Sequence, residues 1–182
     1  MNVYASIRAR AGALLVAHPT MDDPNFERTV VLLLVHDDDA GTMGVVLNRP
    51  ARARGRGPEH GVLAPWLESS QPPEQIFEGG PVEEDGFICL AQDDGADSGV
   101  RSIDILGEDP VEDRRHRIFR GHAGWAPGQL DSEIAGGYWA VVPSRQDDAF
   151  DGSPDTLWRR VLEREGGDHA RLARVPVDPG LN

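Results

Sequence analysis

The stretch TVVLLLVHDDDAGTMGVVL, residues 29–47, decides the fold. Its first part, Thr29 to His36, is an uninterrupted run of β-branched and leucine residues, which is the pattern of a strand covered on both faces. Asp37 to Gly41 has the composition of a turn, and Thr42 to Leu47 is a second apolar run. The stretch therefore predicts a β-hairpin whose strands lie inside the protein.

Further strands are expected on both sides of this hairpin. The apolar run Ala13 to His18 predicts a strand before it. After it, short runs predict strands at Gln75 to Glu78, Phe87 to Ala91, Val100 to Leu106, Arg117 to His122 and Tyr138 to Val142. We expect the acidic segment Glu83 to Gly86 to be a turn between two of these strands.

Helices are predicted at three places. Pro127 to Ala135 has a proline near its first turn and two glycines after its end, and Val62 to Leu67 could form a short helix. Ser153 to Glu165 begins with a serine suited to the N-cap. Its expected buried stripe consists of Leu157, Trp158, Val161 and Leu162.

This order of elements indicates one α+β domain over residues 1–182. Strands dominate without a regular βαβα alternation, so we expect a largely antiparallel sheet with two or three flanking helices. The length of 182 residues suits a single domain. Residues 48–60 are expected to form an Arg-rich loop, and residues 167–182 an irregular tail.

The composition excludes several kinds of chemistry. All 18 basic side chains are Arg, so no lysine is present for a P-loop, a Schiff base or an amine nucleophile. The single cysteine, Cys89, excludes an intrachain disulfide and a multi-cysteine metal cage, and its apolar neighbours indicate a core residue. No cofactor is expected.

The net charge of −13 argues against direct DNA binding as the first hypothesis. Arg and acidic residues balance over residues 1–60, so the acidic excess lies entirely in residues 61–182. The Arg-rich loop is the exception, and it could contact phosphates or nucleic acid through Arg49, Arg52, Arg54 and Arg56. A solvated loop that offsets acidic neighbours is the favoured interpretation.

The N-terminal segment does not have the form of a signal peptide. Its apolar run, Ala11 to Ala17, is short, ends at His18-Pro19 and is followed by no small-residue cleavage site. The longest apolar run, Val30 to Val35, is far below the ~20 residues that span a bilayer. We therefore expect a cytoplasmic protein that does not act in the membrane.

Three motifs are candidate binding elements. Asn48 and Arg49 could present an amide and a guanidinium to an anion, although a turn-closing Asn48 and an ion-paired Arg49 are favoured. Gly79-Gly80 could approach a phosphate, but a backbone bend is the more probable role. Trp125 could be a stacking platform with Gln129 beside it, or a residue that staples the following helix.

The six histidines give no recognised metal or catalytic motif. They contain no H-E-x-x-H pattern, and His36 beside three aspartates in a turn is only weak support for a divalent ion. The one acid–base-rich stretch contains His18, Asp22, Asp23 and His36, which would have to serve any His/carboxylate-dependent enzyme. We assign no catalytic residue and no metal ligand.

Five blocks of sequence carry a family resemblance: GALLVAHP (12–19), DPNFERTV (23–30), HDDDAGTMGVVLNRP (36–50), FEGGPV (77–82) and GHAGWAPGQLDSEI (121–134). In their order and spacing they resemble the YqgE/AlgH family, and the resemblance covers nearly the whole chain. The resemblance implies a strongly curved, barrel-like sheet with flanking helices. It also implies the function given by the family's label, that of a transcriptional regulator. His122, where tyrosine is more usual, and the Arg-rich loop depart from the family pattern.

Three functional hypotheses follow. The favoured one is a non-enzymatic cytoplasmic regulatory or accessory protein that binds a protein partner or small ligand around Asn48-Arg49, Gly79-Gly80 and Trp125. The alternative is a transcriptional regulator that binds DNA directly through the Arg49 to Arg56 segment, although no helix-turn-helix pattern is visible. The third is a His/carboxylate-dependent enzyme.

Overall fold

A computed structural model describes residues 7–52, 61–110 and 114–176. The described elements are β1 (Ala13–Ala17), β2 (Val30–Asp37), β3 (Gly41–Val46), α1 (Ala64–Glu68), β4 (Ile76–Glu78), β5 (Val82–Gln92), β6 (Val100–Ile103), β7 (His116–Trp125), α2 (Gln129–Ala135), β8 (Trp139–Pro143), the 3₁₀ helix η2 (Asp148–Phe150), α3 (Pro154–Glu165) and α4 (Gly167–Leu172).

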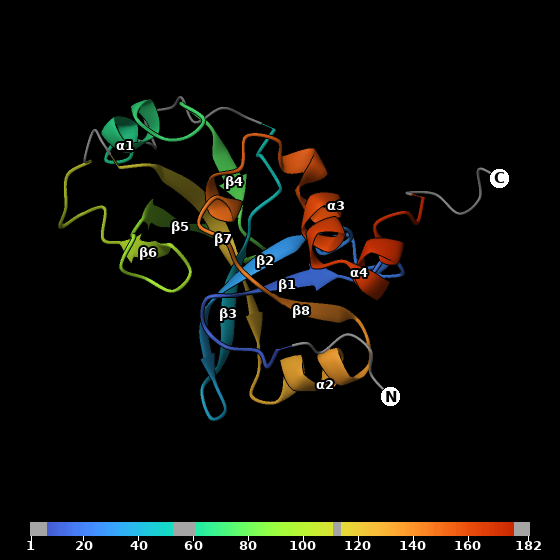
Figure 1. Ribbon diagram of the computed structural model, residues 1–182. Coiled ribbons are helices and arrows are strands. Elements are labelled where there is room, and N and C mark those ends of the chain that lie inside the picture. The colour runs from blue at the N-terminus through green and yellow to red at the C-terminus, as the bar shows by residue number, and fades with distance from the viewer. Residues whose placement is uncertain (1–6, 53–60, 111–113, 177–182) are drawn as a thin grey trace.

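The strands form one curved sheet in the order β6-β5-β7-β3-β2-β1-β8, with β4 joined to β7 outside this path (Figure 1). All neighbours along the path are antiparallel, and only the short β4 runs parallel to its partner. The predicted hairpin is confirmed as β2 and β3. The α+β class and the largely antiparallel, strongly curved sheet are likewise confirmed.

The central strands bury both faces, as the unbroken apolar pattern predicts. In β1, Leu14 and Val16 belong to one core, whereas Ala13 and Leu15 belong to another, because successive side chains point to opposite sides of a strand. The first core contains the α3 residues Leu157, Trp158, Val161 and Leu162. The second contains Leu130 of α2.

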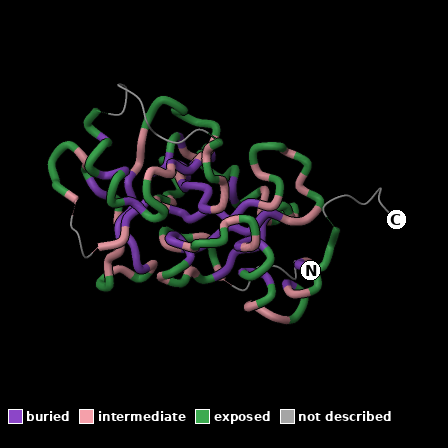
Figure 2. The backbone as a smooth tube through the Cα atoms, turned by 90° about the horizontal axis from the view of Figure 1, so that it is seen from above, coloured by how far each residue is buried: buried purple, intermediate pink, exposed green. Residues whose placement is uncertain are grey.

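The helices therefore cover different parts of the sheet. Figure 1 shows α2 beside β8 on one side of the sheet and α3 with α4 on the other. Beneath α1, a third core contains Trp66 and Leu67 together with Cys89 of β5. Figure 2 shows buried chain running through the middle of the molecule and exposed loops around it. Within the described ranges, no helix is long and apolar enough to cross a membrane.

Two predicted strand boundaries are wrong. Residues 83–86, expected to be a turn between strands, lie inside β5, where the register with β7 shifts between Val82 and Phe87. These residues are exposed and form a bulge, after which the strand continues. The partner strand β7 extends beyond the predicted end at His122 to Trp125, because residues 123–125 pair with β3.

Three further details differ from the expectations at the helices. The helix α2 begins at Gln129, two residues after the predicted start at Pro127. Ser153 occupies the N-cap of α3, but its side chain makes no capping hydrogen bond. Residues 167–182 are expected to form an irregular tail, but Gly167–Leu172 form the helix α4, which follows α3 directly after Gly166.

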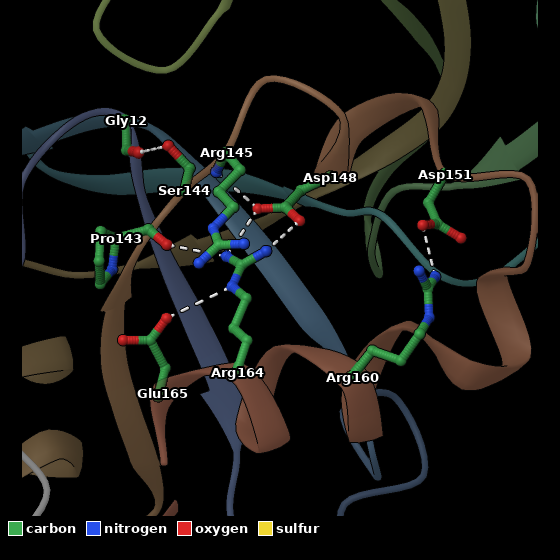
Figure 3. A network of polar contacts seen from close by, with 9 residues as sticks. All are labelled: Gly12, Pro143, Ser144, Arg145, Asp148, Asp151, Arg160, Arg164 and Glu165. Atoms are coloured by element: carbon green, nitrogen blue, oxygen red, sulfur yellow. Dashed lines mark hydrogen bonds and ion pairs between the residues drawn. The ribbon is translucent and has the colours of Figure 1, made fainter.

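A network of polar contacts fastens α3 to the edge of the sheet (Figure 3). Nη2 of Arg164 donates to Oδ2 of Asp148 at 2.8 Å and to the carbonyl oxygen of Pro143 at 2.9 Å. The backbone N–H of Arg145 donates to the same carboxylate at 2.6 Å. Since the side chains of Arg164 and Asp148 are only 15% and 7% exposed, this ion pair joins α3, η2 and β8 inside the protein.

Candidate functional site

Asn48 is a structural residue at the exit of β3. Its Oδ1 accepts a hydrogen bond from the N–H of Val30 at 2.9 Å, and its Nδ2 donates to the carbonyl oxygen of Arg28 at 2.9 Å. The amide thereby completes the pairing between the end of β3 and the start of β2. Asn48 therefore joins two segments 18 and 20 residues apart, where the expectation was that it closes a turn.

Arg49 holds the segment that precedes β2. Its Nη1 donates to the carbonyl oxygen of Asn25 at 2.7 Å, and Nη2 donates to that of Glu27 at 3.1 Å. The expected carboxylate partner is thus replaced by backbone carbonyls. Burial lowers the pKa of the Arg49 guanidinium, while the charges of Glu27 and Asp23 act in the opposite direction. Arg49 fixes residues 25–27 across the sheet.

Gly79 and Gly80 are required by the close approach of β7. A Cβ atom at Gly79 would lie 2.3 Å from the carbonyl oxygen of Gly121, and one at Gly80 would lie 2.3 Å from the backbone of His122. Gly80 also has φ +149°, which a side chain rarely permits. The close approach of the β7 backbone accounts for both glycines.

Arg49 and Gly80 nevertheless line one small hollow. It has a volume of about 210 Å³, and its other charged residues are Glu78 and Glu84. The guanidinium of Arg49 is already used by two carbonyls, and Glu78 is paired with Arg120. The hollow therefore offers few free polar groups for a ligand.

Trp125 belongs to an aromatic cluster organised by one carboxylate. Nε1 of Trp125 and Nε1 of Trp139 both donate to Oε2 of Glu133, at 2.9 and 2.8 Å. Phe26 stacks on Trp125 with ring centroids 6.0 Å apart and meets Trp139 edge-on at 5.5 Å. Nε2 of Gln129 donates to Oε1 of Glu133 at 2.9 Å. Trp125 is thus tied to the following helix α2 through Glu133.

A second hollow, of about 280 Å³, opens beside this cluster, and we name it the aromatic-acidic hollow. Its chemically distinctive lining residues are the aromatic Phe26, Trp125, Tyr138 and Trp139 and the acidic Asp22, Asp23 and Glu133. Tyr138 is 53% exposed at its rim. No basic residue occurs among the described residues that line it. Aromatic faces and carboxylates together favour a positively charged guest.

The structure thus divides the predicted binding residues between two hollows. Arg49 and Gly80 line the first, whereas Trp125 and Gln129 line the second. Both hollows border the segment 21–26, which contributes Asn25 to the first and Phe26 to the second. Asn48 and Gly79 line neither.

The candidate nucleic-acid contacts fall largely outside the described chain. Arg52 is exposed, whereas Arg54 and Arg56 lie beyond the described residues.

The acid–base stretch does not assemble into one pocket. Asp22 and Asp23 line the aromatic-acidic hollow, whereas His36 lines a different one. His18 bonds through Nδ1 to Oγ1 of Thr20 at 2.8 Å, and burial lowers the pKa of its imidazole. His36, Asp38 and Asp131 do bring ligand atoms within 4.8 Å of one another, a set that could hold a divalent ion.

Cys89 lies in the core, as predicted. It is 1% exposed on β5, and burial together with the charge of Glu108 raises the pKa of its thiol to about 12. A thiol with such a pKa is a poor nucleophile at neutral pH.

Sequence reasoning missed several residues of the aromatic-acidic hollow. Glu133 follows Gln129 by four residues on α2, a spacing that places both on one helix face and could have linked them. Phe26, Tyr138 and Trp139 give no comparable signal, because their approach to Trp125 depends on how β1, β7 and β8 lie in the folded sheet.

Comparison with known proteins gives a consistent family. A family model described as AlgH-like matches residues 14–170. A UPF0301 protein of Thermobifida fusca is 44% identical over all of both chains, and one of Streptomyces coelicolor is 40% identical over all of both chains.

Two solved structures extend this likeness to the fold. The crystal structure of a Corynebacterium diphtheriae protein matches with a TM-score of 0.79 and 27% identity, over 96% of this chain and 98% of that one. The solution structure of the AlgH protein from Pseudomonas aeruginosa matches with a TM-score of 0.64 and 26% identity, over 94% and 97% of the two chains.

Proposed function

This chain belongs to the AlgH-like family, and we propose that it is a non-enzymatic, cytoplasmic regulatory or accessory protein that acts by binding a cationic group in the aromatic-acidic hollow. The group would be an ammonium or guanidinium, carried by a small molecule or by a side chain of a partner protein. The hollow's volume of about 280 Å³ suits a group of that size better than a large cofactor.

The observation that carries this proposal is the setting of Glu133. Its half-buried carboxylate accepts hydrogen bonds from two indoles and one amide, all of them neutral donors. Asp22 and Asp23 add further negative charge in the same hollow, and the described lining supplies no cation to offset it. A cationic guest would gain from these carboxylates as well as from the aromatic faces.

The same chemistry supports the proposal of a non-enzymatic role. Glu133 is fully engaged in holding Trp125 and Trp139, so it is poorly placed to move protons. Neither histidine of the acid–base stretch lines the aromatic-acidic hollow. The hollow is thus better suited to holding a charge than to reacting with one.

Isothermal titration with choline tests the proposal, because choline carries a quaternary ammonium. Its matched control is 3,3-dimethylbutan-1-ol, which has a similar shape without the charge. We expect saturable binding of choline and none of the neutral alcohol. Equal binding of the two compounds, or binding of neither, would contradict the proposal.

Variants locate the binding. A double variant with Asp22→Asn and Tyr138→Ala removes one exposed acid and one rim ring but leaves the Glu133 cluster intact, and we expect choline to bind roughly tenfold more weakly. Asp85→Asn removes the same amount of charge from the exposed bulge of β5 and is the control. A double variant that binds choline like wild type would show that the hollow is not the site.

A further inference from the structure

Arg117 is a buried cation on β7. Only 1% of the residue is exposed, and its guanidinium lies over the ring of Phe77 at 4.0 Å from the ring centroid. Its Nε donates to the carbonyl oxygen of Gln71 at 2.7 Å, and its Nη2 donates to that of Asp151 at 2.9 Å. The side chain is therefore held rigidly in one position.

The guanidinium has unused hydrogen-bonding capacity. Nη1 is buried and has no hydrogen-bond partner among the described residues. The carboxylate of Asp151, whose charge acts on Arg117, is bound to Arg160 and to the N–H of Ser153, and Asp151 gives Arg117 a hydrogen bond only through its backbone carbonyl. Burial lowers the pKa of Arg117 to about 10, so the group remains charged at neutral pH. A buried charge without a paired anion is costly.

Arg117 lies in the wall of a hollow of about 580 Å³ that shares no lining residue with the aromatic-acidic hollow. The two segments that bond to its guanidinium also supply the walls, with Gln71 and Pro72 from one and Phe150 and Gly152 from the other. The only acidic lining residue among those described is Glu68. Phe150 and Pro72 give the hollow apolar surface next to the buried cation.

We propose that this hollow binds a small organic carboxylate, with its anionic head on Nη1 of Arg117 and its apolar body against Phe150 and Pro72. A carboxylate oxygen is the preferred partner of a guanidinium N–H, and such charge-assisted bonds are stronger than neutral ones. Nη1 is itself buried, so the exposed residues 71–73 must shift for the head group to reach it. This site is independent of the aromatic-acidic hollow.

Titration with sodium benzoate, followed by ¹H–¹⁵N spectra that include the arginine Nε–H signals, tests this site. We expect benzoate to shift the Arg117 signal in a saturable way, whereas benzyl alcohol, which lacks the charge, leaves it unchanged. An equal response to both compounds, or no saturable response to benzoate, would overturn the proposal.

Two variants assign the response to the hollow. Arg117→Gln removes the charge, and we expect benzoate to bind roughly tenfold more weakly or not at all. Gly152→Val leaves Arg117 in place but adds a side chain at a lining position of the hollow. The new side chain has room, because a Cβ at Gly152 would meet nothing within 4 Å. It should block benzoate even if Arg117→Gln fails to fold.

Arg101→Gln is the matched control, because Arg101 is paired with Glu108 at the surface of β6 and lies outside this hollow. It should bind benzoate like wild type. Unchanged benzoate binding in folded Gly152→Val would place the anion elsewhere and overturn the assignment.

Discussion

Glu133 holds two indole N–H groups on one carboxylate oxygen and the Gln129 amide on the other. Asn48 and Arg49 act in the same manner, because their side chains satisfy backbone groups of the segments at 25–30. At the residue scale, most of the polar groups that resembled ligand-binding groups form hydrogen bonds with other groups of the chain itself. These partners would destabilise the fold if they were buried without a hydrogen bond. The sequence shows the residue type but not which of these partners it meets.

Cys89 gives a direct test of the core assignment. Because burial raises the pKa of its thiol to about 12, Ellman's reagent at about pH 8 should label it only negligibly in the folded protein. Full labelling is expected once urea unfolds the chain. Rapid labelling under native conditions would contradict the buried position of Cys89 on β5.

Asp151 gives a pH dependence whose sign can be stated. Burial alone would raise the pKa of its carboxyl, but hydrogen bonds from Arg160 and the N–H of Ser153 outweigh burial, so the pKa is lowered. The resulting stabilisation is present above the unfolded pKa of about 3.9 and is lost as the pH falls through the folded value.

We therefore expect wild type to be more stable than Asp151→Asn near neutral pH, with the gap narrowing below about pH 4. Urea unfolding of both proteins across this range measures it. A gap that stays constant, or widens on acidification, would be the contrary result.

At the scale of elements, the hairpin of β2 and β3 and the helix α3 could be predicted because their signals are local. The unbroken apolar runs and the turn composition between them predict the hairpin. The apolar spacing of three to four residues predicts the helix. The bulge in β5 could not be predicted, since Glu83 to Gly86 reads as a turn unless β7 continues to pair beyond it. The helix α4 could not be predicted either, because six residues are too few to show a helical pattern of apolar positions.

Because Arg164 attaches α3 to the sheet, we expect Arg164→Met to destabilise the protein. This change leaves the nearly buried Asp148 without its cation, and we expect the free energy of unfolding to fall by about 3 kcal/mol. Adding Asp148→Leu should recover part of the loss. Urea unfolding gives the values.

The control for this change is Arg159→Met, an exposed position on the same helix, which should alter stability by less than about 0.5 kcal/mol. Equal effects of Arg164→Met and Arg159→Met would show that the network in Figure 3 adds nothing to stability.

At the scale of the whole molecule, the charge of −13 favours positively charged partners that approach the surface. Of the three acids that line the aromatic-acidic hollow, Glu133 belongs to the acidic excess after residue 60, whereas Asp22 and Asp23 lie in the charge-balanced part of the chain. The sequence identified Trp125 and Gln129, but not the rings and acids that fold around them. Their meeting depends on the order of strands in the sheet, for which short sequence motifs carry no signal.

The same charge predicts the outcome of a DNA-binding assay. At ~50 mM salt we expect no salt-dependent affinity for duplex DNA, because the acidic surface repels phosphates and the Arg-rich loop alone supplies few contacts. A salt series followed by fluorescence anisotropy measures this. Affinity that falls steeply as salt rises would instead support the regulator that binds DNA directly.

The central claim is that the aromatic-acidic hollow receives a cation, and the indole N–H signals of the four tryptophans test it most directly. In a ¹H–¹⁵N titration with choline, the signals of Trp125 and Trp139 should shift together and saturate. Those of Trp66 and Trp158, which lie in other cores, should stay in place. Unmoved Trp125 and Trp139 signals, or shifts of all four alike, would contradict the account.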